Sequence, residues 1–179
     1  GINASNNGDT VLVQSGTYFE TLNYYGKEIM VASNYLFSQD TTDIQNAIID
    51  ALNQNSVVTF ENGETNNSKL IGFTLIHGFG NSDPDTGGGI TIQNSSNPYL
   101  EWLIITNNIS SEKGGGIYIN NASPILVNVK ILNNNSDQSG GGIYCIYSQN
   151  LSIYNSELNY NTGSNGGGLY LTSSNVTIT

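Results

Sequence analysis

The sequence predicts an all-β solenoid, a single-stranded parallel β-helix with rungs of about 26 residues. Three observations predict it. Gly-Gly-Gly triplets begin at Gly87, Gly114, Gly140 and Gly166, so they recur every 26 or 27 residues. Each triplet is followed by an apolar–polar–apolar segment such as Ile117-Tyr118-Ile119, which is the alternation of a half-buried strand. No segment has a convincing helical period, so each strand must pair in parallel with its equivalent in the next rung.

The first 86 residues fit the same plan with less regularity. Period-two alternation predicts strands over residues 9–13, 27–33, 56–60 and 69–78. In the last of these, His77 takes the corner position that later rungs fill with Asn107 and Asn133, so we expect it to be a corner hydrogen-bonding residue. A short helical turn is expected around residues 43–52.

Residues 87–179 form the regular part, where each rung reads as triplet, short strand, Asn/Ser turn, second strand and Asn-rich corner. The second strands are expected over residues 98–105, 124–131 and 150–158. At the corner, Asn107-Asn108 aligns with Asn133-Asn134. Asn tolerates left-handed backbone angles, and the amides of stacked Asn side chains can bond along a ladder. We therefore expect one β-helix domain over residues 1–179, as a piece of a longer chain.

The composition excludes several classes of partner. The chain has 14 Asp and Glu against 4 Lys and no Arg, for a formal net charge of −10. Because nucleic-acid binding depends on Lys and Arg neutralising phosphates, we expect no nucleic-acid partner. No stretch approaches the roughly 18 apolar residues of a membrane helix, so we expect no membrane insertion.

The single cysteine, Cys145, replaces an Ile or Leu of the other rungs and is interpreted as a buried hydrophobe outside any disulfide.

The opening of the chain resembles that of a known fold family. The segment Gly8-Asp9-Thr10-Val11-Leu12-Val13, followed by Gly16-Thr17-Tyr18 and Gly26-Lys27, is similar to the opening of bacterial right-handed parallel β-helix proteins of the pectate-lyase-like superfamily. The Gly triplets resemble the later coils of its secreted, surface-associated members, including adhesin-like and polymorphic outer-membrane types. The resemblance covers essentially the whole chain. It implies a right-handed helix, a secreted, extracellular or cell-surface location, and a capping helix that ends at residues 1–4.

The same resemblance offers an enzyme as an alternative. Pectate lyases of this fold use a basic residue, usually Arg, with Ca²⁺ held by carboxylates, and this chain has no Arg. Hydrolases of the fold use clustered carboxylates, for which the candidates are Asp85, Glu112 and Asp137, each shortly before a Gly triplet. Asp83 and Asp85 are the candidates for a calcium site, and otherwise we expect no metal and no cofactor. The competing interpretation is that all of these acids are solvated turn residues.

Tyrosines supply the candidate binding site. Tyr118, Tyr144 and Tyr170 each lie between two inward apolar residues at a spacing of 26, so they should point outward in one column, about 4.8 Å apart. Thr91 takes the first place in that column. Such a column either stabilises neighbouring strands by stacking or forms an exposed strip that binds sugar rings. Trp102 is equivalent to Asn128 and is expected on the surface as a second aromatic contact.

These observations favour a non-catalytic segment of a secreted or cell-surface protein. It would act as an adhesin or stalk that contacts a polysaccharide or cell-surface glycan through neutral Asn, Ser, Thr and Tyr faces, where repetition supplies avidity. Two alternatives stay open. One is a polysaccharide-active lyase or glycoside hydrolase, and the other is a structural filament or scaffold subunit that associates end to end with other copies.

Overall fold

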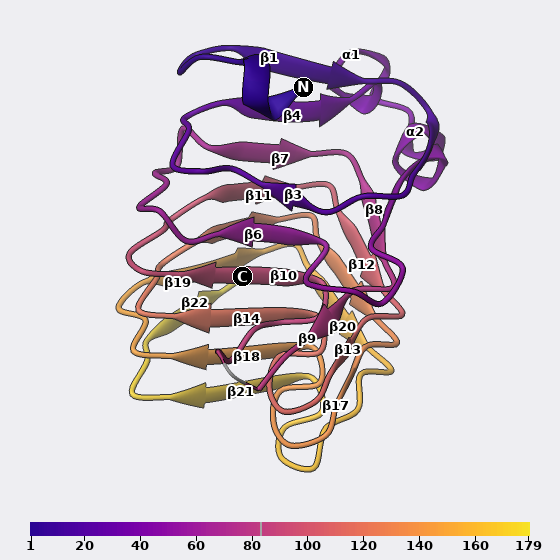
Figure 1. Cartoon of the computed structure of the whole chain (residues 1–179). Helices are drawn as coiled ribbons and strands as arrows, with labels where there is room; N and C mark the ends of the chain where they lie inside the picture. The colour runs from indigo at the N-terminus through magenta and orange to yellow at the C-terminus, as the bar shows by residue number, and fades with distance from the viewer. Residues whose placement is uncertain (83) are drawn as a thin grey trace.

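A computed structural model describes residues 1–82 and 84–179 as a parallel β-solenoid of about 6 turns. Figure 1 shows the rungs stacked along one axis, from β1 at the top to β21 at the bottom. Every strand within the sheets pairs in parallel with its equivalent in the neighbouring rung. The all-β solenoid predicted from the triplet spacing is therefore confirmed.

Each rung runs through sheet 1, sheet 2 and sheet 3 in that order, and three of the rungs add a strand of a short sheet between sheets 2 and 3. Sheet 1 contains β1 (Thr10–Val13), β4 (Met30–Ser33), β7 (Lys69–Ile71), β11 (Tyr99–Glu101), β15 (Ile125–Val127), β19 (Leu151–Tyr154) and β22 (Val176–Ile178). Sheet 2 contains β2 (Gly16–Tyr18), β5 (Ala47–Asp50), β8 (Thr74–Ile76), β12 (Ile104–Thr106), β16 (Lys130–Leu132) and β20 (Glu157–Asn159). The short sheet contains β9 (Phe79–Gly80), β13 (Ile109–Ser110) and β17 (Asn135–Ser136). Sheet 3 contains β3 (Leu22–Asn23), β6 (Val58–Phe60), β10 (Ile90–Gln93), β14 (Ile117–Asn120), β18 (Ile143–Ile146) and β21 (Leu169–Thr172).

The long second strands expected in the regular rungs are each two strands separated by a corner. Trp102, Asn128 and Asn155 have φ angles of 52°, 54° and 47°, in the left-handed region, and Gly72 takes the same place with φ 82°. A single left-handed residue turns the chain from sheet 1 into sheet 2. Period-two alternation alone could not show this corner, because the apolar pattern continues across it.

The helices are short and lie at the N-terminal end. They are the 3₁₀ helix η1 (Ile2–Ala4), α1 (Tyr35–Ser38) and α2 (Thr41–Asn46). The Asp40 side chain accepts a hydrogen bond from the Thr42 amide and caps α2. The helical turn expected over residues 43–52 is wrong in its second half, because Ala47–Asp50 form β5. There Ala47 and Ile49 are buried in the solenoid, so core burial outweighs local helix preference.

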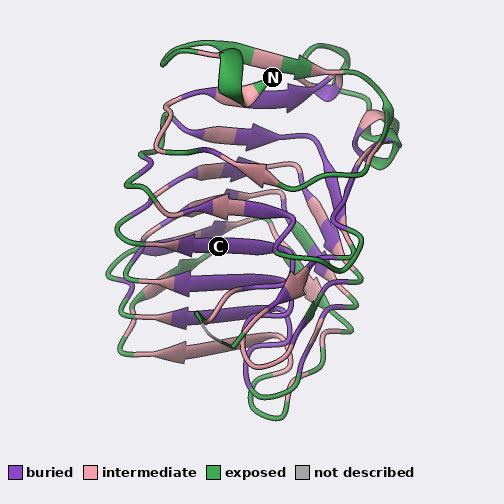
Figure 2. Cartoon of the chain, in the orientation of Figure 1, coloured by how far each residue is buried: buried purple, intermediate pink, exposed green. Residues whose placement is uncertain are grey.

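The core is a stack of mainly aliphatic side chains inside the coil, and the strands that carry them are largely purple, the colour of buried residues, in Figure 2. Leu70, Leu100 and Leu126 lie in register in successive strands of sheet 1, and all three are fully buried. Each buried Leu contributes roughly 1.5–3 kcal/mol. Cys145 pairs with Ile119 in the preceding rung and is buried, which confirms its interpretation as a core hydrophobe.

A ladder of buried asparagine side chains links the corners after sheet 2. The Asn108 Nδ2 donates to Asn134 Oδ1 at 3.0 Å, and the Asn134 Nδ2 donates to Asn161 Oδ1 at 3.0 Å. The preceding residues, Asn107 and Asn133, supply the left-handed φ. The Asn ladder expected from the sequence is confirmed, with its two roles divided between neighbouring residues.

The Gly triplets lie against this ladder, and they must be glycine because no side chain fits there. A Cβ on Gly116 would lie 2.5 Å from the Gly142 carbonyl oxygen and 3.1 Å from the Asn134 Nδ2. Gly89 meets Gly116 and Asn108 in the same way, at 2.5 and 3.1 Å. The repeat of the triplet therefore follows from backbone stacking between rungs.

Candidate functional site

The tyrosine column is present and stacked. The Tyr118 and Tyr144 rings are 5.6 Å apart with an interplanar angle of 2°, and the Tyr144 and Tyr170 rings are 5.4 Å apart at 6°. Thr91 occupies the first place of the column, in register with Tyr118. Its hydroxyl accepts from the Gly87 amide and bonds the Ser56 hydroxyl. Stacked aromatic pairs of this kind add roughly 0.2–1 kcal/mol each to sheet stability.

The expectation that this column is an exposed strip is wrong for its first two members. Tyr118 is 3% exposed and Tyr144 is 6% exposed, although both point away from the coil interior. The first glycine of each triplet lies against the backbone of the column, since a Cβ on Gly114 would be 2.8 Å from the Tyr118 Cα. Burial raises the pKa of both phenols. Tyr170, at the lower end of the column, is partly exposed.

Lys113 covers part of this column. Its Nζ lies 5.7 Å from the centroid of the Tyr144 ring and 2.8 Å from Asp85 Oδ2. The Glu112 Oε2 is 3.8 Å from the same nitrogen. The hydrogen bond to Asp85 raises the pKa of Lys113. The loop that carries Asp85 is thus tied to the next rung by a partly exposed ion pair, an interaction worth about 0–1 kcal/mol.

The candidate catalytic carboxylates are only partly brought together. Asp85 and Glu112 both face Lys113, whereas Asp137 is exposed. Its backbone amide donates to the Ser110 carbonyl. The calcium candidate Asp83 lies outside the described residues. Across residues 1–82 and 84–179, no three His, Cys, Asp or Glu side chains gather as metal ligands. The catalytic role of these acids stays a prediction.

Trp102 is less exposed than the sequence suggested. Its ring lies 5.2 Å from that of Tyr35, and both belong to a small cluster outside the coil with Ile44 and Ile71. The insertion that carries α1 and α2 thus covers part of Trp102. The expected equivalence with Asn128 is correct, because both residues hold the left-handed corner after sheet 1.

Two buried acids were not predicted from the sequence. Glu64 is almost fully buried, and its carboxylate accepts from the Gly26 amide, the Asn62 amide and the Ser96 hydroxyl. Asp50 lies 3.0 Å from the Nδ1 of His77, which holds a left-handed corner as expected. No sequence motif marks either acid, because the side chains that bond it are 27 or more residues away and its other partners are backbone groups. Both link rungs together.

A cavity of about 560 Å³ opens at the N-terminal end of the coil. Its lining includes core residues Val31, Ile49 and Phe73. The 3₁₀ helix η1 borders it and is held by Lys27, whose ammonium donates to the carbonyls of Ile2, Asn3 and Ser5 at 2.7, 3.1 and 2.9 Å. The residues at the start of the chain thus pack over the first rung.

In the regular rungs, two exposed aromatic side chains lie at corners instead. Tyr147, with φ 56°, is 57% exposed, and Tyr160, with φ 55°, is 84% exposed. Each holds a left-handed corner where the preceding rung has an asparagine, Asn121 and Asn133 respectively. A bulky residue at such an angle is uncommon, and the left-handed conformation costs roughly 1–2 kcal/mol. The sequence indicates corners through their repeated Asn, but only aromatic residues expected in strands were considered as binding residues.

Comparison with known families gives a match to one segment. Residues 103–120 match the Chlamydia polymorphic membrane protein (Chlamydia_PMP) repeat. The matched segment runs through β12, the corner with Asn108, β13, the second Gly triplet and β14. It therefore contains the ladder asparagine and the glycines that define the rung. No curated protein and no solved structure matches the chain.

The described helices are short. Neither α1, of 4 residues, nor α2, of 6, could span a bilayer, and no helix elsewhere in residues 1–82 and 84–179 has the length and hydropathy of a membrane span.

Proposed function

We propose that this chain is an adhesin-like, surface-exposed segment of a bacterial surface protein, of the passenger type that an outer membrane displays. The observation that carries the proposal is the polymorphic membrane protein repeat over residues 103–120. That repeat coincides with the structural unit that builds every regular rung, the ladder Asn and the Gly triplet. The chain would act as an elongated, non-catalytic stalk.

The outer surface supports weak, repeated contact with glycans. Only 10% of residues are charged, and the exposed positions are largely Asn, Ser, Thr and Tyr. Uncharged amides and hydroxyls bond sugar hydroxyls, while exposed tyrosine rings pack on the apolar faces of sugars. Single contacts of this kind are weak, and many copies on one surface raise the overall affinity by avidity.

The test is binding to a glycan array and to soluble polysaccharides, with reducing ends and unsaturated products measured in the same wells. We expect binding that is clear when the chain is displayed in many copies on beads, weaker for the monomer, and free of product. A Tyr144→Phe variant is the control, since it keeps the buried stack and should bind like the wild type. Product formation would favour the lyase or hydrolase, and absence of binding in both formats would remove the adhesin proposal.

A further inference from the structure

Two corners of the solenoid have a tyrosine where the preceding rung has an asparagine. In the corner after sheet 3, Asn121 and Ser173 hold left-handed angles on either side of Tyr147 along the stack. In the corner after sheet 2, Asn107 and Asn133 precede Tyr160. Asn enters this region readily because its short side chain bonds locally, whereas Tyr has no such compensation. The two tyrosines therefore impose backbone strain that asparagine in the same places avoids.

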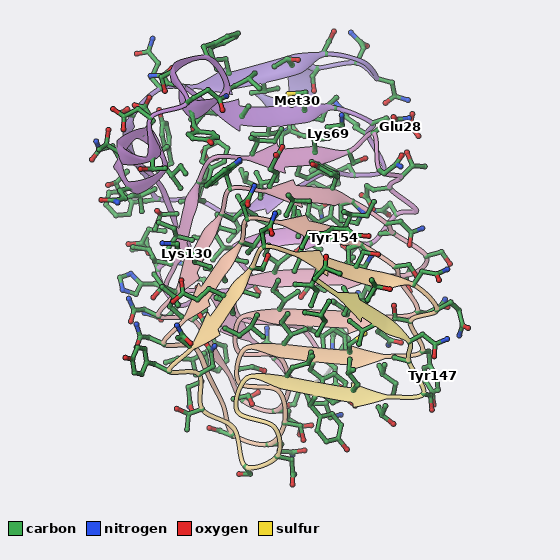
Figure 3. The ribbon with its side chains drawn as sticks, turned by 180° about the vertical axis from the view of Figure 1, so that it is seen from behind. Glu28, Met30, Lys69, Lys130, Tyr147 and Tyr154 are labelled. Atoms are coloured by element: carbon green, nitrogen blue, oxygen red, sulfur yellow. The ribbon has the colours of Figure 1, made fainter. Side chains whose placement is uncertain are left out.

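Packing within the chain does not offset this strain. Trp102, the other aromatic corner residue of the regular rungs, is half-buried against Tyr35 and gains stability from that contact. Tyr147 and Tyr160 leave most of their side chains in solvent. Figure 3 shows Tyr147 at the edge of the solenoid where the rungs turn, directed away from the strands. Backbone strain that no packing within the chain offsets indicates that the two tyrosines serve binding rather than stability.

We propose that Tyr147 and Tyr160 are contact residues for uncharged glycan chains. The inference rests on the proposed function and names the residues and the ligand class that serve it. Both tyrosines sit at exposed corners, so a glycan reaches their rings without any rearrangement of the strands.

The surroundings of the two rings suit an uncharged, hydroxyl-rich ligand. Asn159 precedes Tyr160 in the chain, and Asn121 takes the corner next to that of Tyr147 in the stack, so each tyrosine has an asparagine at an adjacent position. A formal net charge of −10 repels a polyanionic chain at long range. Sugar rings of a neutral glycan would pack on the tyrosines while their hydroxyls bond the neighbouring amides.

The test combines stability and binding in one variant, Tyr147→Asn/Tyr160→Asn, which restores the residue of the preceding rungs. We expect its melting temperature to rise by about 2–4 °C or more. We expect its affinity for the neutral probes mannan, dextran and xyloglucan to fall about tenfold or more for each tyrosine, the loss typical of an aromatic contact residue. Polygalacturonate serves as the acidic probe. The control Asn133→Tyr adds a corner tyrosine and should lower the melting temperature without lowering binding.

The outcomes separate the two proposals. If the wild type binds none of the glycans on beads, the proposed function fails and this inference fails with it. If the wild type binds and the double variant binds equally well, only the assignment of Tyr147 and Tyr160 is overturned. A preference for polygalacturonate would overturn the uncharged ligand class. A double variant no more stable than the wild type would overturn the strain argument.

Discussion

Asn134 is the single residue whose loss should most weaken the regular rungs. Its Nδ2 donates to the Ile105 carbonyl and to Asn161, and its Oδ1 accepts from both the amide and the side chain of Asn108. The bonds to Asn108 and Ile105 are buried, so Asn134→Ala leaves several polar groups without partners, each costing about 1–3 kcal/mol.

We expect Asn134→Ala to lower the free energy of unfolding in urea by about 3 kcal/mol or more. Its neighbour Asn133 provides the matched control, because it is exposed and holds the left-handed φ of 53°. Asn133→Gly keeps that angle accessible and should change stability by less than about 0.5 kcal/mol. Equal losses in both variants would show that the ladder adds nothing beyond the corner.

The buried tyrosines should make folding sensitive to alkaline pH. Burial raises the pKa of Tyr118 and Tyr144 above that of an unfolded phenol, near 10. A group with a raised folded pKa contributes stability that is complete below its unfolded pKa and is lost as pH rises through the folded pKa. The contribution of these phenols to the free energy of unfolding should therefore be complete below about pH 10 and fall above it.

The variant Tyr118→Phe/Tyr144→Phe tests this assignment by urea unfolding across the same pH range. It should lose less stability above about pH 10 than the wild type does. Part of the fall should persist, because the pKa values of Tyr24, Tyr35 and Tyr99 are also raised by burial. Identical pH profiles for variant and wild type would mean that the stacked column does not control alkaline unfolding.

At the level of residues, period-two alternation predicts which side of a strand a residue occupies, and here it is correct. Tyr118 does point away from the core, in register with Thr91 and Tyr144. Exposure depends in addition on what covers that side. Part of the cover over Tyr144 is Lys113, which comes from the preceding rung and is close to Tyr144 only once the chain has coiled. No local pattern carries that information.

The Gly triplet is the element that lets the backbones of neighbouring rungs approach closely beside the strands. A Cβ on Gly115 would lie 2.4 Å from the Asn135 carbonyl oxygen and 2.5 Å from that of Gly141. Both obstacles are backbone atoms of the next rung, so neither can move without opening the stack. We expect Gly115→Ala to destabilise the chain by about 3 kcal/mol or more, measured by urea unfolding.

Gly63 is the control for this prediction. It has φ 75° and no heavy atom within 4 Å of a built Cβ, so Gly63→Asn keeps the turn and meets nothing. Its effect should stay within about 0.5 kcal/mol. A tolerated Gly115→Ala would show that the rungs can separate locally.

Strands could be predicted from the sequence where the apolar alternation and the turn residues indicated the same boundaries. They were missed where the two disagreed. The strands after each triplet were predictable because the glycines mark their starts. The corner between sheets 1 and 2 was hidden because the apolar alternation continues across Trp102, Asn128 and Asn155. The strand β5 was hidden because no turn residue within 43–52 marks where it begins. Its partner strand β8 lies about 26 residues further along the chain, so no local pattern shows the pairing.

At the scale of the whole molecule, excess negative charge opposes the stacking of rungs. The formal net charge is −10, and only 4 Lys offset 14 Asp and Glu. Like charges held close together in the coil repel one another more than in the extended unfolded chain. Screening at higher ionic strength should therefore favour the folded state.

We expect the urea midpoint to rise between 20 mM and about 500 mM NaCl, where the Debye length falls from roughly 20 Å to about 4 Å. The control variant Glu20→Gln/Asp137→Asn removes two exposed acids and so reduces the negative net charge from −10 to −8. It should be more stable than the wild type at low salt and gain less from added salt. A midpoint that falls with salt would instead mean that attractive pairs such as Lys113 with Asp85 outweigh the repulsion across the coil.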